Sequence, residues 1–167
     1  RRQRQMCIRD SGWGNGESQF YTANSENVRV EDGVLKITAK RENFAGYNFT
    51  SARIISYDKY EFKYGRVDIR AKLPAGVGTW PALWMLGANY TEVGWPECGE
   101  IDIMEHWGHE PTNIAGSIHT PMSYGNTQTH GYTNVNDYNQ EFHTYSIDWN
   151  QNRIQFFVDD ILYYTYN

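Results

Sequence analysis

The sequence has 167 residues, of which 40% are apolar and 21% charged, and its net charge is −5. This length suits one domain with a hydrophobic core, and the apolar content argues against a disordered chain. No apolar run reaches the roughly 20 residues of a membrane-spanning helix, and no basic patch follows the first nine residues to suggest nucleic-acid binding. We therefore expect a globular domain with neither a membrane nor a nucleic acid as partner.

The N-terminal segment differs in composition from the rest of the chain. Residues 1–11 carry four arginines and have no apolar core of the kind found in a signal peptide. We interpret 1–11 as an extraneous segment and 12–167 as the domain. Cys7 lies in this segment, which leaves Cys98 alone, so the sequence predicts no disulfide framework and no zinc site.

Alternation of apolar and polar residues, rather than helical periodicity, dominates the chain. The segment VRVEDGVLKITA predicts two strands around the tight turn Asp32-Gly33. In RVDIRAKLP, the apolar residues from Val67 to Leu73 face one way and the charged ones face the other. The last 26 residues predict three strands, with turns at 150–152 and 159–160.

About ten such short strands predict an all-β antiparallel sandwich or barrel. We expect loops at 43–48, 89–96 and 121–139, the last of them long and polar. The chain stops at Tyr164-Thr165-Tyr166-Asn167, within a predicted strand, so we expect an incomplete domain that lacks terminal strands.

Three acids, Glu100, Asp102 and Glu105, interrupt the apolar segment GEIDIMEHWG at 99–108. On a regular strand the first two share a face, whereas Glu105 would join the isoleucines in the core. A buried, unpaired carboxylate costs several kcal/mol. One extra residue, a β-bulge at Ile103-Met104, would return Glu105 to the face of the other acids.

Three acids in a row on one strand face are consistent with several functions. Two inward-leaning glutamates could bring their carboxyl groups to roughly 5–6 Å, which is near the separation in retaining glycosidases. A solvated strand face and calcium ligation by clustered carboxylates are the alternatives. Four nearby tryptophans favour a sugar-binding cleft, because indole faces stack on sugar rings. They are Trp80, Trp84, Trp95 and Trp107.

The segment 99–108 resembles a signature of a known family. GEIDIMEHWG is similar to the bulged E-x-D-x-x-E signature of glycoside hydrolase family 16, in its laminarinase-like endo-β-1,3-glucanase branch. Flanking stretches resemble the same family, and the resemblance runs from about Trp13 to Tyr166. These stretches are WGNGESQFYT (13–22), TSARI (50–54), YGRVDIRAKLP (64–74), GTWPALWML (78–86), GWPECGEIDIME (94–105) and GSIHT (116–120).

The resemblance implies a β-jelly roll of two curved antiparallel sheets (concanavalin A-like). It implies Glu100 as nucleophile, Glu105 as general acid/base and Asp102 as their support, in a retaining double displacement. It also implies cleft roles for further residues: Trp80, Trp84, Trp95, Trp107, His119, Asn15 and Arg53. A structural ion pair is the alternative for Arg53, and a hydrophobic core position is the alternative for Trp80 and Trp84.

The implied activity is endo-cleavage of β-1,3 or mixed β-1,3-1,4 glucans. Hydrolysis of agar, porphyran or carrageenan, or non-catalytic glucan binding, remain alternatives. We expect a secreted or cell-surface monomer, because the substrate is a large polymer. Two carboxylates need no cofactor. Relatives often hold a structural calcium, but its ligands cannot be identified in this sequence.

Overall fold

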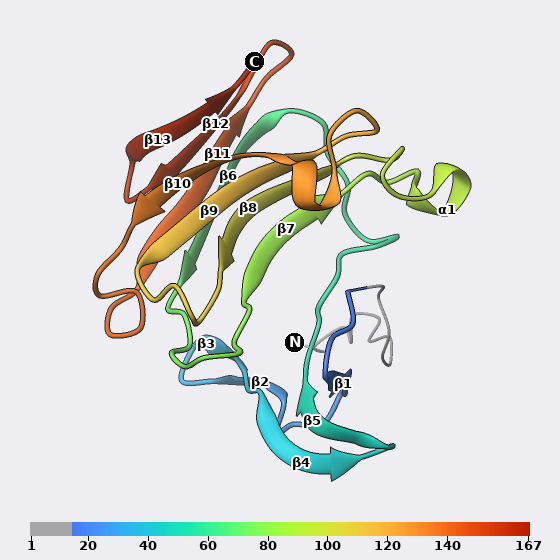
Figure 1. Cartoon of the computed structure of the whole chain (residues 1–167), viewed down its shortest axis with the longest axis vertical. Coiled ribbons are helices and arrows are strands. Elements are labelled where there is room, and N and C mark those ends of the chain that lie inside the picture. Colours follow the sequence, from blue (N-terminus) through green and yellow to red (C-terminus); the bar gives the residue numbers. More distant parts are fainter. Residues whose placement is uncertain (1–14) are drawn as a thin grey trace. The chain divides into compact units, whose positions relative to one another are not determined.

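The computed structural model describes residues 15–167, so the predicted extraneous segment 1–11 lies outside the described residues. Contacts divide the chain into two compact units, one up to Glu61 and one from Phe62 to Asn167. In both units the regular secondary structure is almost entirely strand, as predicted (Figure 1). No helix among the described residues has the length and apolar character needed to cross a membrane.

The first unit contains five strands. They are β1 (Gln19–Tyr21), β2 (Val28–Glu31), β3 (Val34–Ile37), β4 (Lys40–Phe44) and β5 (Tyr47–Ser51). β2 and β3 form the predicted hairpin, and its turn residues Asp32 and Gly33 both have positive φ, as a two-residue hairpin turn requires. β1 pairs with β5 in parallel, a departure from the expected antiparallel arrangement. The long connection between these strands permits this pairing.

Polar contacts hold the hairpin of the first unit to its sheet. The Asn27 side chain is fully buried and donates hydrogen bonds to Thr38 O at 3.0 Å and to Thr50 Oγ1 at 2.9 Å.

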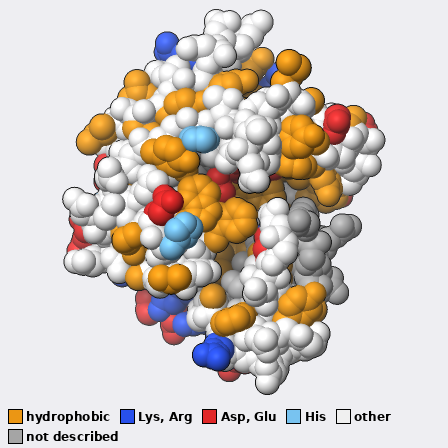
Figure 2. All heavy atoms as spheres, viewed as in Figure 1, with side chains coloured by type: hydrophobic (Ala, Val, Ile, Leu, Met, Phe, Trp, Pro, Cys, Tyr) orange, Lys and Arg blue, Asp and Glu red, His pale blue; other side chains and the backbone are white. Residues whose placement is uncertain are grey.

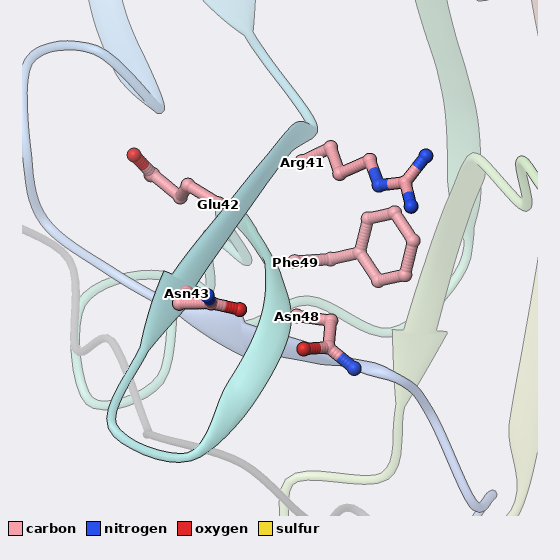
Figure 3. A pocket seen from close by; sticks show the side chains of 5 residues that line it. All are labelled: Arg41, Glu42, Asn43, Asn48 and Phe49. Atoms are coloured by element: carbon pink, nitrogen blue, oxygen red, sulfur yellow. The ribbon is translucent and has the colours of Figure 1, made fainter.

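A hollow of about 520 Å³ lies on the β4–β5 pair, where the Arg41 and Phe49 side chains point in the same direction (Figure 3). None of the predicted catalytic residues lines this hollow.

The second unit holds the remaining elements in two four-stranded antiparallel sheets (Figure 1). One sheet has the order β10-β9-β8-β7 and the other the order β13-β12-β11-β6. The strands are β6 (Gly65–Ala71), β7 (Ala82–Leu86), β8 (Glu100–His106), β9 (Asn113–His119), β10 (Thr129–Asn134), β11 (His143–Trp149), β12 (Ile154–Val158) and β13 (Ile161–Tyr166). A one-turn helix α1 (Tyr90–Val93) and a 3-10 turn η1 (Gly125–Thr127) complete the unit.

The core of the second unit lies between these two sheets. Ile114 of β9 and Ile147 and Phe156 of the other sheet are fully buried in one hydrophobic cluster. The sheets approach closely at Gly116, where an added Cβ would lie 2.5 Å from the Phe156 ring. The predicted apolar face of β6 packs against this core and ends at the buried Leu73, which confirms its alternation.

Two sequence predictions for connecting segments were wrong. The stretch 121–139 is not one long loop, because β10 pairs with β9 along Thr129–Asn134. β10 is an edge strand whose side chains are largely exposed, Tyr132 among them. Because few of its side chains are buried, its sequence THGYTN lacks the apolar alternation by which a strand is predicted. The predicted loop 89–96 contains α1, a single turn too short for helical periodicity to reveal.

Apolar side chains also remain at the surface of the second unit. Ile161 and Leu162 of β13 and Tyr132 of β10 are all at least 47% exposed. Figure 2 shows hydrophobic side chains in patches among polar ones, whereas basic side chains are sparse on the face presented there.

Candidate active site

The strand that carries the three acids contains the predicted β-bulge. Asp102 of β8 is paired with Ser117 of β9, and Glu105 with Ala115, so two residues of β8 oppose the single Gly116. The pairing of β7 with β8 shifts at the same place, between Leu83 and Trp84. The spacing of the acids is therefore explained by a bulge that re-aims the side chain after it.

The bulge places both of its own side chains in the core. Ile103 and Met104 are 2% and 1% exposed and belong to the hydrophobic cluster. Glu105 is buried as well, but its carboxylate accepts hydrogen bonds and does not join that cluster. The prediction that Glu105 returns to the polar face of β8 is confirmed.

Two neutral donors hold the Glu105 carboxylate. Trp80 Nε1 donates to Oε1 at 3.0 Å, and Ser117 Oγ donates to Oε2 at 3.1 Å. Ser117 was not among the residues predicted for the site. A signal was available, because Ser117 lies two residues before His119 and thus shares its strand face.

The other two acids have partners of their own. Trp95 Nε1 donates to Glu100 Oε2 at 2.6 Å, a short bond typical of a charged acceptor. His119 Nε2 lies 3.1 Å from Asp102 Oδ2, although that oxygen has no well-aligned hydrogen bond among the described residues. Glu100, Asp102 and His119 offer polar atoms that all lie within 4.8 Å of one another.

Burial raises the pKa values of all three acids. Desolvation, followed by the charge of Asp102, raises the pKa of Glu100 to about 7. Desolvation, followed by the charge of Glu105, raises the pKa of Asp102 to about 8. Desolvation also raises the pKa of Glu105, against the hydrogen bonds from Trp80 and Ser117. Glu100 and Asp102 therefore retain protons near neutral pH, and the titrations of the three crowded carboxyls belong to the group.

These raised pKa values predict that the protein loses stability as pH rises. The unfolded chain releases the Asp102 proton near the ordinary pKa of 3.8, whereas the folded chain keeps it up to about 8. The stabilising contribution is thus complete below pH 4 and disappears as pH rises from about 4 to 8. We expect Asp102→Asn to raise the unfolding free energy at pH 8 by on the order of 2 kcal/mol.

Thermal unfolding of both proteins at a series of pH values tests this expectation. The variant should show a flatter decline between pH 5 and 8 than the unchanged protein. Glu92→Gln, which removes an exposed carboxylate of α1, controls for the loss of one negative charge. Parallel pH curves for the Asp102→Asn and the unchanged protein would contradict the assignment.

The cluster of Glu100, Asp102 and His119 resembles a metal site in composition but not in its hydrogen bonding. The Gly125 backbone N–H donates to His119 Nδ1 at 3.1 Å. A neutral imidazole with an accepting Nδ1 carries its proton on Nε2, so Nε2 has no lone pair to offer a metal. The arrangement therefore favours carboxylate chemistry over metal ligation at this cluster.

The remaining predicted residues occupy different settings. Trp80 and Trp95 are 46% and 40% exposed beside the carboxylates that they contact. Trp84 is half-buried on β7 and is paired with Asp102 of β8. Its neighbours in sequence, Leu83 and Met85, pack on the core as predicted. Trp107 lies beyond the end of β8 and is half-buried. Sugar contacts by these rings stay predictions.

Asn15 and Arg53 belong to the first unit. Asn15 is exposed. Arg53 forms an ion pair with Glu17 at 3.0 Å and hydrogen-bonds the Tyr21 hydroxyl at 3.2 Å, which matches the structural alternative for this residue. A role in holding sugar stays a prediction for both.

Comparison with known proteins identifies the family of this chain. The model of "Glycosyl hydrolases family 16" matches residues 15–167. The chain belongs to this family. It is 47% identical over 161 residues to a beta-glucanase of Rhodothermus marinus, covering 93% of this chain and 56% of that protein. It is 41% identical over 164 residues to a glucan endo-1,3-beta-glucosidase of Cryptopygus antarcticus, covering 93% and 60% respectively.

Solved structures agree with the family assignment. The laminarinase catalytic domain of Thermotoga maritima matches with a TM-score of 0.91 and 42% identity, over 96% of this family 16 chain and 69% of that chain. The predicted jelly-roll class is thereby confirmed. The chain spans little more than half the length of the two curated relatives.

Proposed function

We propose that the protein containing this chain is an endo-acting, retaining glycoside hydrolase that cleaves β-1,3 glucans, including mixed β-1,3-1,4 chains. One observation carries the proposal: the bulge in β8 sets two glutamates and an aspartate on one polar face, where neutral donors hold both glutamates and Asp102 is buried between them. Relatives whose names describe glucan cleavage match the chain on both sides of this strand.

The proposal gives each glutamate the role that the family resemblance implies. In its protonated form Glu105 donates its proton to the leaving glycosidic oxygen while Glu100 attacks the anomeric carbon, so the C–O bond breaks as the glycosyl-enzyme bond forms. Water then gives a proton back to Glu105 and displaces Glu100, which restores both groups. Desolvation raises the pKa of Glu105 and so favours its acid form, and the Trp95 N–H stabilises the ionised Glu100.

Asp102 supports the different roles of Glu100 as nucleophile and Glu105 as acid/base. It hydrogen-bonds to Glu100, and its own pKa of about 8 keeps it protonated at neutral pH. Because the two carboxyls share a proton through this contact, the ionisation that frees Glu100 to attack belongs to the pair. The exposed indoles of Trp80 and Trp95, which border the acids, suit stacking on sugar rings.

A panel of polysaccharides tests the proposed function. We expect the full-length protein to release reducing ends from laminarin and from a mixed-linkage glucan, as oligosaccharides of several lengths, with retained β configuration at first. Glu100→Gln provides the matched inactive control. Release from agarose or carrageenan in place of glucan would identify another polymer, and binding of laminarin without release over the control would indicate a glucan-binding protein.

Charge argues against the sulfated polymers in that panel. The chain carries a net charge of −5, and basic side chains are sparse on the face shown in Figure 2. A groove for a sulfated chain requires basic residues to balance the sulfates. Secretion follows as part of the proposal, because a large polymer has to be met outside the cell.

A further inference from the structure

The connection between β9 and β10 lies against the partners of the two acids Glu100 and Asp102. This segment, residues 120–128 and here called the β9–β10 loop, is ordered by its own hydrogen bonds. Thr120 and Ser123 form a two-residue bridge, and the Ser123 hydroxyl donates to Thr127 O. The loop therefore offers its backbone and side chains to the site in one defined arrangement.

The loop determines which ring nitrogen of His119 carries the proton. Gly125 has φ +58°, a left-handed conformation that glycine adopts without steric cost, and its N–H donates to His119 Nδ1 at 3.1 Å. Because Nδ1 is the acceptor, the neutral ring has its proton on Nε2. Nε2 lies 3.1 Å from Asp102 Oδ2, although the two atoms are not aligned as a hydrogen bond. A second ring proton on Nδ1 would oppose the Gly125 N–H.

The same loop supports the partner of Glu100. The Tyr124 ring packs edge-on against the Trp95 indole, with centroids 5.3 Å apart and an interplanar angle of 83°. Trp95 also packs against the His119 ring, with ring centroids 5.7 Å apart, and its Nε1 donates to Glu100 Oε2 at 2.6 Å. Two neutral N–H groups that face adjacent carboxyls thus depend on one segment of nine residues.

We propose that the β9–β10 loop is a positioning element for the nucleophile: Gly125 keeps His119 as the neutral Nε2–H tautomer toward Asp102, and Tyr124 keeps Trp95 on Glu100. The catalytic part of this inference rests on the proposed function. The Nε2–H dipole beside Asp102 Oδ2 disfavours a proton on that oxygen and so biases where the proton of the Glu100–Asp102 pair resides.

Imidazole nitrogen NMR of the full-length protein, labelled with ¹⁵N-histidine, tests the tautomer without any substrate. The His119 signals can be assigned by their loss in His119→Gln. At a pH where the ring is neutral, we expect the pattern of protonation on Nε2. A neutral ring protonated on Nδ1 would overturn the proposal even if the protein hydrolyses glucan.

Paired variants at Tyr124 test the second contact. Tyr124 is 45% exposed, so truncation should leave the fold intact, which circular dichroism can verify. We expect Tyr124→Ala to lower kcat on laminarin roughly tenfold, with KM changed less than about twofold. The acid limb of its pH profile should move to higher pH, because the Trp95 hydrogen bond lowers the pKa of Glu100.

Tyr124→Phe keeps the ring and is the matched control, with kinetics and pH profile like those of the unchanged protein. A Tyr124→Ala variant that raises only KM, or that leaves the acid limb in place, would show a substrate contact or a passive loop and would overturn the positioning role. Absence of all glucan hydrolysis by the unchanged protein would instead contradict the proposed function, while the NMR measurement would still decide the tautomer.

Discussion

Replacement of Glu100 by alanine is expected to lower kcat on laminarin by on the order of 10⁴-fold or more, because it removes the group that forms the covalent intermediate. KM should change little, since Glu100 is a half-buried carboxylate at the reacting atom and not a stacking platform. Steady-state reducing-end assays measure both parameters. Glu97→Ala, three residues earlier and exposed, is the matched control for loss of one acid.

Chemical rescue gives this variant a second readout. With an aryl β-glucan oligosaccharide as substrate, added azide should enter the space left by the Glu100 side chain and attack the anomeric carbon as the phenolate departs. The product should be an α-glycosyl azide, because one displacement inverts configuration. A β-azide, or rescue of Glu97→Ala in place of Glu100→Ala, would assign the nucleophile elsewhere.

Replacement of Glu105 by glutamine should lower kcat on laminarin about 10²–10⁴-fold, the usual contribution of general acid–base catalysis. Glutamine keeps the size of the side chain and can still accept the Trp80 N–H, which holds Glu105 Oε1 at 3.0 Å. The loss therefore reports on the proton and not on packing. An aryl substrate with a low leaving-group pKa should suffer much less in the first chemical step, which a pre-steady-state burst of phenolate would reveal.

The pH profile distinguishes this role from a structural one. In the unchanged protein, activity should fall as pH rises through the raised pKa of Glu105, because the acid form is then lost. Glu105→Gln should lack that basic limb. A variant that keeps the same basic limb, or that loses activity equally on laminarin and on the aryl substrate, would contradict the assignment of Glu105 as the acid/base. Glu110→Gln, an exposed acid after β8, serves as control.

Much of the fold was predictable because local patterns and tertiary packing agree. The hairpin at Asp32-Gly33 and the alternation of β6 each follow from turn chemistry or from one buried face. β10 was missed for the opposite reason. Its sequence THGYTN carries no apolar alternation, and only the hydrogen bonds of β9 make it a strand.

The candidate site divides in the same way. The irregular spacing of Glu100, Asp102 and Glu105 predicted a bulge, since a regular strand would have buried an unpaired carboxylate. Ser117 and Gly125 were not predicted: Ser117 shares a strand face with His119, but neither a serine nor a glycine by itself identifies a catalytic site. Their importance comes from which atoms the folded chain brings within about 3 Å of Glu105 and His119.

The sequence by itself determined the all-β architecture, the bulged strand and the three acids, because periodicity, turn residues and the cost of burying a charge act over a few neighbouring residues. Only the tertiary structure decided how those acids are held and protonated. Hydrogen bonds from Trp80, Trp95 and Ser117, the tautomer of His119 and the desolvation that raises each pKa all depend on how the folded chain places loops and neighbouring strands around the acids.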